Sequence, residues 1–122
     1  MFRPPRLPTP TSIVNEFTLQ RECVNWLSTY HQHVIFTSTC GGAGSKTTHS
    51  KMMATGYLKG IPDMLLLNPP IAVEFKWGNR PLRPEQKMVI EELNRCGNWK
   101  VFVIRSFDEF VSIMTRELQP IV

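Results

Sequence analysis

The sequence predicts a three-layer α/β domain with a mixed β-sheet, and three observations lead to this expectation. Segments whose apolar residues recur at helical spacing alternate with short β-favouring apolar runs. Helical segments are available for both faces of a sheet. The chain has 122 residues, which suits one domain with its own core. We expect a flexible, basic, proline-rich arm over residues 1–10 and a single domain over residues 11–122, in the order α-β-β-β-α-β-α.

The first helix is expected to begin just after the arm, with Thr11 or Ser12 as its N-cap. Its apolar residues recur on one side of the helix, at Ile13, Val14, Phe17, Val24 and Leu27. Glu16 and Gln20 fall within or beside this apolar arc, whereas Glu22 points to the opposite side. A carboxylate on the inward face needs a partner, because burying an unpaired charge is costly.

Three apolar runs, at residues 34–36, 63–67 and 71–76, are expected to be strands. The breaker Asn68-Pro69-Pro70 separates the last two and predicts a hairpin. Between the first two lies a long connection rich in Gly, Ser and Lys, with a short helix expected over residues 51–55. Its segment GGAGSKTT (41–48) differs from a nucleotide-binding loop because Ser45 separates Gly44 from Lys46. We therefore expect no nucleotide cofactor and interpret residues 41–59 as a substrate-contacting loop.

The C-terminal third predicts helix, strand, helix. Pro84 and Gly97 bracket a helix, residues 99–104 form a buried strand, and Ser106 caps the last helix. The inward side chains of the two helices are expected to be Val89, Ile90, Leu93 and Cys96, and then Phe107, Phe110, Val111 and Met114.

Composition excludes some classes of protein. No apolar run approaches the roughly 20 residues that span a bilayer, and the N-terminus lacks a signal-peptide pattern, so we expect a soluble intracellular protein with no membrane partner. Three cysteines without a C-x-x-C pair indicate a reducing compartment. A zinc site combining Cys40 with histidines stays conceivable but lacks the usual paired spacing. The formal net charge of +4 suits a polyanionic partner.

The hairpin brings three charged residues together. If it is symmetric about the bond between Asn68 and Pro69, Asp63 lies opposite Glu74 on one face, and Lys76 shares that face. Two carboxylates inside an apolar hairpin are unfavourable unless a positive charge sits between them, which predicts a Mg²⁺ or Mn²⁺ site. Glu16 could complete the shell. The alternative is that Asp63 caps a turn while Glu74 and Lys76 form an exposed edge pair.

These residues carry a family resemblance over about residues 14–104. Gly60-Ile-Pro-Asp63 followed by Glu74-Phe-Lys76 resembles the PD-(D/E)XK nuclease signature, and the wider pattern looks like its VRR-NUC branch. The matching positions are Glu16, Gln20, Lys51, Gly56, Lys59, Gly60, Pro62, Asp63, Glu74, Lys76 and Gln86.

The resemblance implies a restriction-endonuclease-like core and a catalytic site. By it, Asp63 and Glu74 ligate the metal, Glu16 supports it, and Lys76 orients or activates the attacking water. Gln86 steadies that end of the site, although an exposed residue on the first helical turn explains it almost as well. The family's standalone viral or bacterial members imply a homodimer acting on branched or Holliday-junction-like DNA, in the cytoplasm of a bacterial or virus-infected cell.

The expected activity is therefore a metal-dependent DNA endonuclease. The alternatives are a non-cleaving nucleic-acid-binding protein with the same fold and a broadly nicking or restriction-like nuclease. Basic residues around the site are expected to neutralise DNA phosphates, namely Lys46, His49, Lys51, Lys59, Arg80, Arg83 and Lys87. Leu19, Trp26 and Trp77 are candidates for the dimer interface, and core packing explains them almost as well.

Overall fold

The computed structural model describes residues 12–39 and 46–118, and it describes the side chains of all of these except residues 46–49. The expected arm at residues 1–10 and the loop at residues 40–45 lie outside the described residues. The elements, in chain order, are α1 (Glu16–Tyr30), β1 (Phe36–Ser38), α2 (Lys46–Ala54), β2 (Met64–Leu67), β3 (Pro70–Phe75), α3 (Pro84–Cys96), β4 (Lys100–Ile104) and α4 (Phe107–Glu117).

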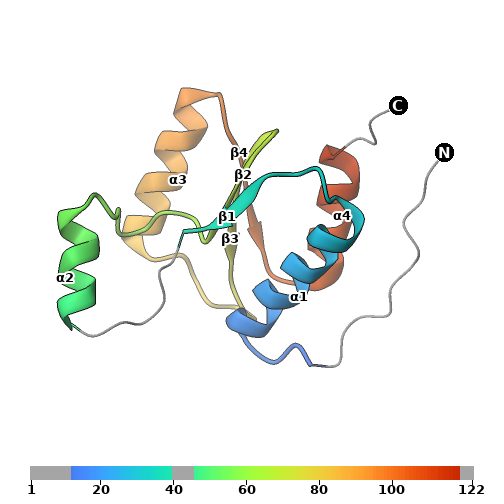
Figure 1. Ribbon diagram of the computed structural model, residues 1–122, viewed down its shortest axis with the longest axis horizontal. Helices are drawn as coiled ribbons and strands as arrows, with labels where there is room; N and C mark the ends of the chain where they lie inside the picture. Colours follow the sequence, from blue (N-terminus) through green and yellow to red (C-terminus); the bar gives the residue numbers. More distant parts are fainter. Residues whose placement is uncertain (1–11, 40–45, 119–122) are drawn as a thin grey trace.

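The four strands form one mixed sheet in the order β1-β2-β3-β4. β1 and β2, and β2 and β3, pair antiparallel, whereas β3 and β4 pair parallel through the crossover that contains α3. Helices α1 and α4 lie together on one side of the sheet and α3 lies on the other (Figure 1). This arrangement confirms the expected three-layer α/β architecture with a mixed sheet. Helix α2 stands apart from the sheet, at the far left of Figure 1.

The core lies between the sheet and the α1/α4 layer. Leu19 and Trp26 of α1, Phe75 of β3 and Phe110 of α4 are all buried there. The ring of Phe110 lies 6.0 Å from both the Phe75 and the Trp26 rings, centroid to centroid. Burial of each such side chain stabilises the fold by roughly 1.5–3 kcal/mol. Of the two explanations given for Leu19 and Trp26, core packing is therefore the correct one, because both side chains are buried within the chain.

Helix α1 begins later than expected. Its N-cap is Asn15, neither Thr11 nor Ser12, because the Asn15 side chain accepts a hydrogen bond from the Thr18 N–H at 2.8 Å while the Thr18 hydroxyl accepts from the Asn15 N–H. This reciprocal pair satisfies backbone donors that would otherwise lack partners. The inward face is consequently Leu19, Cys23, Trp26 and Leu27, while Val14 and Phe17 stay exposed.

The remaining elements agree with the sequence in kind and differ at their ends. β1 starts at Phe36, two residues later than expected, and Phe36 is the first of its residues to pair with β2, opposite Leu66. Helix α2 is longer than the expected 51–55. Helix α3 has the expected bounds but covers the sheet loosely: Val89, Ile90 and Leu93 are half-buried, whereas Met88 and Cys96 are exposed. Among the described helices, none is long and apolar enough to cross a bilayer.

Candidate active site

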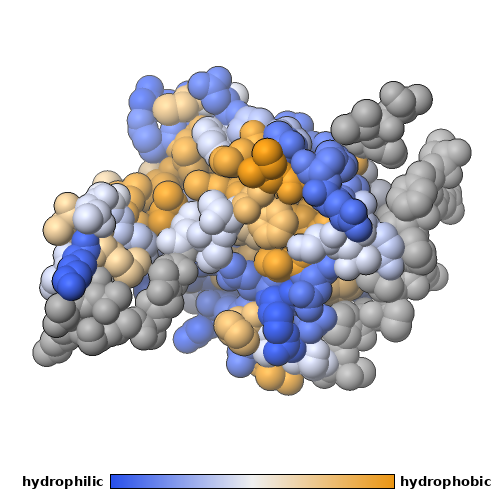
Figure 2. Space-filling model, in the orientation of Figure 1, coloured by the Kyte–Doolittle hydropathy of each residue, from blue (hydrophilic) through white to orange (hydrophobic). Residues whose placement is uncertain are grey.

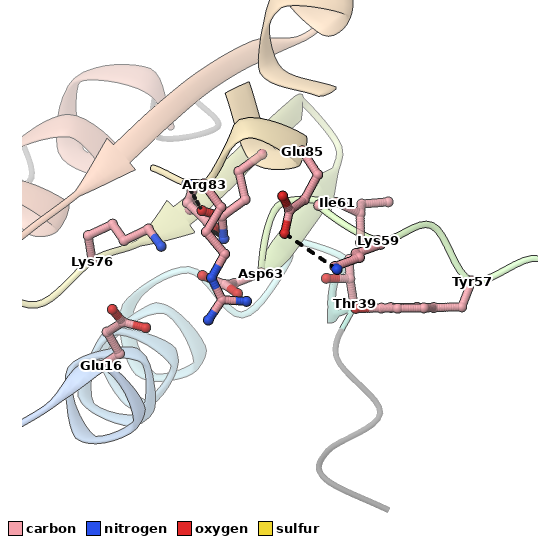
Figure 3. Close-up of a pocket in the computed structure, with 12 residues that line it drawn as sticks. Glu16, Thr39, Tyr57, Lys59, Ile61, Asp63, Lys76, Arg83 and Glu85 are labelled. Atoms are coloured by element: carbon pink, nitrogen blue, oxygen red, sulfur yellow. Dashed lines mark hydrogen bonds and ion pairs between the residues drawn. The ribbon is translucent and has the colours of Figure 1, made fainter. Parts of the chain in front are cut away.

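A pocket of about 200 Å³ lies on the α3 side of the sheet, where the hairpin, the start of α1 and the start of α3 come together (Figure 3). Seven of the predicted site residues line it: Glu16, Lys59, Asp63, Glu74, Lys76, Arg83 and Gln86. The hairpin register explains why Asp63, Glu74 and Lys76 lie together. Met64 pairs with Val73, so the predicted symmetry about the bond between Asn68 and Pro69 is correct.

Asp63 is fixed by backbone groups on both sides. Its Oδ2 accepts a hydrogen bond from the Phe75 N–H at 2.8 Å, and its carbonyl accepts from the Thr39 N–H at 2.9 Å. The Thr39 hydroxyl also donates to the Pro62 carbonyl at 2.5 Å. The carboxylate is therefore held at the start of β2 by the two neighbouring strands.

Glu74 is almost completely buried, with 1% of its surface exposed. Its Oε1 accepts a hydrogen bond from Gln86 Nε2 at 2.5 Å, but no donor reaches its Oε2 within the described part of the chain. The pKa of Glu74 is raised to about 9. Burial is the largest cause, and a hydrogen bond with the Asp63 side chain and the charge of Asp63 act in the same direction. The charge of Lys76 opposes this shift. Without a cation, burial and the charge of Asp63 therefore favour the protonated form of Glu74.

The Gln86 amide is oriented by two bonds. Its Oε1 accepts from the Arg83 N–H at 2.8 Å, and its Nε2 donates to Glu74. The first turn of α3 reaches this position because Gly60 packs directly beneath it: a Cβ on Gly60 would lie 2.5 Å from the Glu85 carbonyl oxygen. Gly60 also has a φ of +92°, which favours glycine. The glycine of the G-I-P-D motif thus determines how closely α3 approaches Glu74.

Lys76 follows β3 and is buried, although it is charged. Its backbone N–H donates to the Ile104 carbonyl at 2.9 Å, which continues the pairing of β3 with β4. Its side chain points into the pocket (Figure 3). A buried ammonium needs negative partners nearby, and the acidic pair on the same face supplies them.

Glu16 lies at one end of the pocket (Figure 3). Its Oε1 accepts from the Trp77 N–H and from Arg80 Nη1, each at 3.4 Å. No group of three His, Cys, Asp or Glu side chains in residues 12–39 and 50–118 is close enough together to hold a metal ion. The structure thus brings Asp63 and Glu74 together, and places Glu16 in the same pocket with Arg80 as its partner.

The charges of the pocket suit a divalent cation. Its lining has four carboxyl groups, on Glu16, Asp63, Glu74 and Glu85, against three basic side chains, on Lys59, Lys76 and Arg83. One carboxylate oxygen is buried without a donor, and a hard cation satisfies such an atom directly. Mg²⁺ commonly uses only one or two protein carboxylates and takes its other ligands from water and phosphate. The pair Asp63 and Glu74 therefore fits Mg²⁺ or Mn²⁺.

The basic residues expected at a DNA interface fall into four groups. Lys59 and Arg83 line the pocket, and Lys59 Nζ lies 3.9 Å from a Glu85 carboxylate oxygen. Arg80 pairs with the pocket residue Glu16, and 70% of the Arg80 side chain is exposed. Lys51 and Lys87 are exposed outside the pocket lining. The side chains of Lys46 and His49 lie outside the described residues.

Three further lining residues, Thr39, Tyr57 and Glu85, are absent from the sequence-based site. Thr39 reaches the pocket through strand pairing beside Asp63, which only the three-dimensional arrangement reveals. Glu85 precedes the predicted Gln86 in the first turn of α3. The helical periodicity of the sequence does not predict that the Glu85 side chain faces the pocket. Nothing in the sequence singles out Tyr57.

Comparison with known proteins gives a similarity to a solved structure. The sequence matches no protein-family model and no curated protein. A solved structure described as a VRR_NUC domain protein is similar, with a TM-score of 0.63 over 86% of this chain and 88% of that chain, at 19% sequence identity. This similarity agrees with the fold that the G-I-P-D and E-F-K motifs imply. The chain therefore has a VRR-NUC-like fold.

Proposed function

We propose that this protein is a metal-dependent endonuclease that hydrolyses phosphodiester bonds in DNA. The observation that carries the proposal is the buried Glu74 carboxyl group, which lies beside Asp63 and Lys76 in an open pocket and has one oxygen without a donor. Strongly perturbed carboxyl groups of this kind cluster at functional sites. The similar fold of a VRR_NUC domain protein supports a nuclease-family fold.

The chain's own residues have distinct parts in this reaction. Asp63 and Glu74 would hold a divalent cation, and Glu16 is a further carboxylate that lines the same pocket. When bound, the cation supplies positive charge for the phosphoryl oxygens and lowers the pKa of water. Lys76 orients the attacking water and stabilises negative charge that develops in the transition state. Gln86 holds the Glu74 carboxylate in place through its 2.5 Å hydrogen bond.

Lys59 and Arg83 line the rim on the side of α3 and are suited to pair with phosphates flanking the scissile one. We extend the proposal to branched or junction DNA cleaved by a homodimer, since two symmetry-related sites can act on two strands. The net charge of +4 favours a polyanionic substrate. Trp77, which is 37% exposed, is the remaining candidate from the sequence for an intersubunit contact.

Cleavage of a substrate panel tests the proposal. Labelled junction, flap and linear duplex DNA are incubated with the purified protein in Mg²⁺, in Mn²⁺ and in chelator. We expect cleavage with either metal, none in chelator, and a loss of at least about 100-fold in Lys76→Met, which keeps the buried stem and removes the charge. The matched control is Lys100→Met, because Lys100 is an exposed lysine paired with Glu117 far from the pocket.

The outcomes separate the candidate functions. Metal-dependent cleavage that Lys76→Met abolishes, with circular dichroism unchanged, supports the nuclease. Binding of DNA without cleavage of any substrate contradicts the proposal and favours a non-cleaving nucleic-acid-binding protein. Cleavage of all substrates at equal rates contradicts the proposed selectivity for branched DNA.

A further inference from the structure

Two large aromatic side chains are exposed beside the Glu16 end of the pocket. Phe17 is 72% exposed and Trp77 is 37% exposed. Each directly follows a residue that lines the pocket, Glu16 or Lys76. The two segments are joined where the Trp77 N–H donates to Glu16 Oε1 at 3.4 Å. The two backbone segments that carry these aromatic residues thus meet at the Glu16 end of the candidate active site.

Core packing does not explain the exposure of Phe17. Helix α1 buries Leu19, Cys23, Trp26 and Leu27, and Phe17 lies away from that face. Val14, which is 64% exposed, adds further apolar surface at the same end of α1. Figure 2 shows apolar atoms exposed at the lower edge of the molecule, where α1 begins in Figure 1. Single exposed apolar residues are common, but several gathered at the edge of a pocket indicate a binding surface.

The surroundings of the aromatic pair are fixed, and they combine the Glu16 carboxylate with the basic groups of Arg80 and Lys76. Arg105 donates to the carbonyl oxygens of Gly78 and Arg80, at 2.9 and 2.8 Å, and so holds the turn that follows Trp77. The Arg80 guanidinium beside this turn is 70% exposed. Lys76 lies on the pocket side of Trp77. A ligand here meets aromatic faces and cationic groups together, which is the combination that binds the base and the phosphate of a single-stranded nucleotide.

We propose that Phe17 and Trp77 hold an unpaired nucleobase next to the scissile phosphate. A base inside a duplex is stacked on both faces and cannot take this place, so the site requires a substrate with an unstacked nucleotide, as at a flap, gap or branch point. The inference rests on the proposed nuclease function and deepens it, because it gives the selectivity for branched DNA a physical cause. Trp77 then contacts substrate in place of a second subunit.

Binding in chelator tests the inference without cleavage. Fluorescence anisotropy measures the dissociation constants for a duplex carrying a single-stranded flap and for a fully paired duplex of equal length. The variants are Phe17→Ala and Trp77→Ala, with Met88→Ala as control, since Met88 of α3 is 70% exposed and outside the pocket lining. Each aromatic loss should weaken flap binding about 5- to 150-fold, the range for one stacked base, and leave duplex binding within about twofold.

A further variant guards against misfolding. Trp77→Phe keeps an aromatic face and should retain most of the flap affinity that Trp77→Ala loses. Equal losses on both DNAs, or no loss on either, overturn the inference. A change from dimer to monomer in light scattering, with flap affinity per site unchanged, also overturns it and assigns the surface to a second copy of the chain.

The inference and the proposed function fail in different ways. Flap binding that depends on both aromatic residues, without cleavage in Mg²⁺, contradicts the nuclease proposal alone. Metal-dependent cleavage whose preference for flaps is unchanged in Phe17→Ala and Trp77→Ala contradicts the aromatic contact alone.

Discussion

Replacing Glu74 with Gln should make the metal-free protein more stable at neutral pH. Because the pKa of Glu74 is raised to about 9 from an ordinary value of 4.5, the folded protein retains a proton at pH 7 that the unfolded chain has released. Folding therefore takes up a proton, and the free energy of unfolding falls as the pH rises from about 4.5 to about 9. Gln carries no such cost, and its amide can donate to Asp63.

The size of the effect follows from the pKa shift. The cost in free energy of unfolding accumulates from pH 4.5, the ordinary pKa of the carboxyl group, up to pH 7. At about 1.4 kcal/mol per pH unit, it amounts to about 3 kcal/mol at pH 7. Urea unfolding in chelator at pH 7 should therefore show Glu74→Gln to be more stable than the natural sequence by about that amount. The advantage should disappear near pH 4.5, where the unfolded chain also binds the proton.

Two comparisons make this measurement decisive. Glu91→Gln is the matched control, because Glu91 is an exposed residue of α3 outside the pocket lining, and it should change stability by less than about 0.5 kcal/mol. Mg²⁺ should raise the unfolding midpoint of the natural sequence by mass action and leave Glu74→Gln almost unchanged. If Glu74→Gln is equally or less stable than the natural sequence at pH 7 in chelator, the reasoning about this buried carboxyl group is wrong.

Three further predictions follow from the same structure. Gly60→Ala should be less stable than Gly56→Ala by about 1–3 kcal/mol, because both residues have positive φ but only a Cβ at Gly60 meets the backbone of α3; equal losses in urea unfolding contradict this. Burial and a neighbouring histidine lower the pKa of His31, whose Nε2 has no partner among the described residues. Stability should therefore fall as the pH drops below about 6.5, and His31→Asn should remove that part of the pH dependence; an unchanged slope contradicts the assignment. Arg83→Gln should reduce the salt dependence of DNA affinity by about 0.9 in the log–log slope, for one lost phosphate contact. Lys100→Gln, on the far side of the sheet, should leave the slope unchanged, and equal slopes for the two variants contradict the role of Arg83.

The hairpin could be predicted from the sequence because two local rules determine it. Asn68-Pro69-Pro70 fixes where the chain reverses, and the period of two in strands then places Asp63 opposite Glu74. The observed pairing of Met64 with Val73 has the predicted register. The fold class followed from the same kind of pattern, and the observed mixed sheet confirms it.

The start of α1 could not be placed because several residues compete to cap a helix. Thr11, Ser12 and Asn15 are all good N-caps, and only Asn15 forms the reciprocal pair with Thr18. The buried face of α1 is centred on Leu19, Cys23 and Trp26. Phe17, expected inside, is exposed, and it becomes available for binding.

The rest of the pocket depends on tertiary packing that no local pattern encodes. Gln86 reaches Glu74 only because the Gly60 backbone lies against the first turn of α3. Thr39 comes from a segment 21 residues before Gly60 in the sequence and joins the G-I-P-D motif only in space. Arg80 and Glu16 are 64 residues apart, and their ion pair follows from the position of α1 beside the end of β3.

The central claim is that Asp63 and Glu74 together bind a divalent cation. Calorimetric titration of the protein with Mn²⁺, repeated with Asp63→Asn and with Glu91→Gln, tests it most directly. We expect saturable binding that Mg²⁺ competes away, that Asp63→Asn weakens at least about tenfold, and that Glu91→Gln leaves unchanged. Mn²⁺ binding of equal strength in all three proteins, or none in the natural sequence, would contradict the claim.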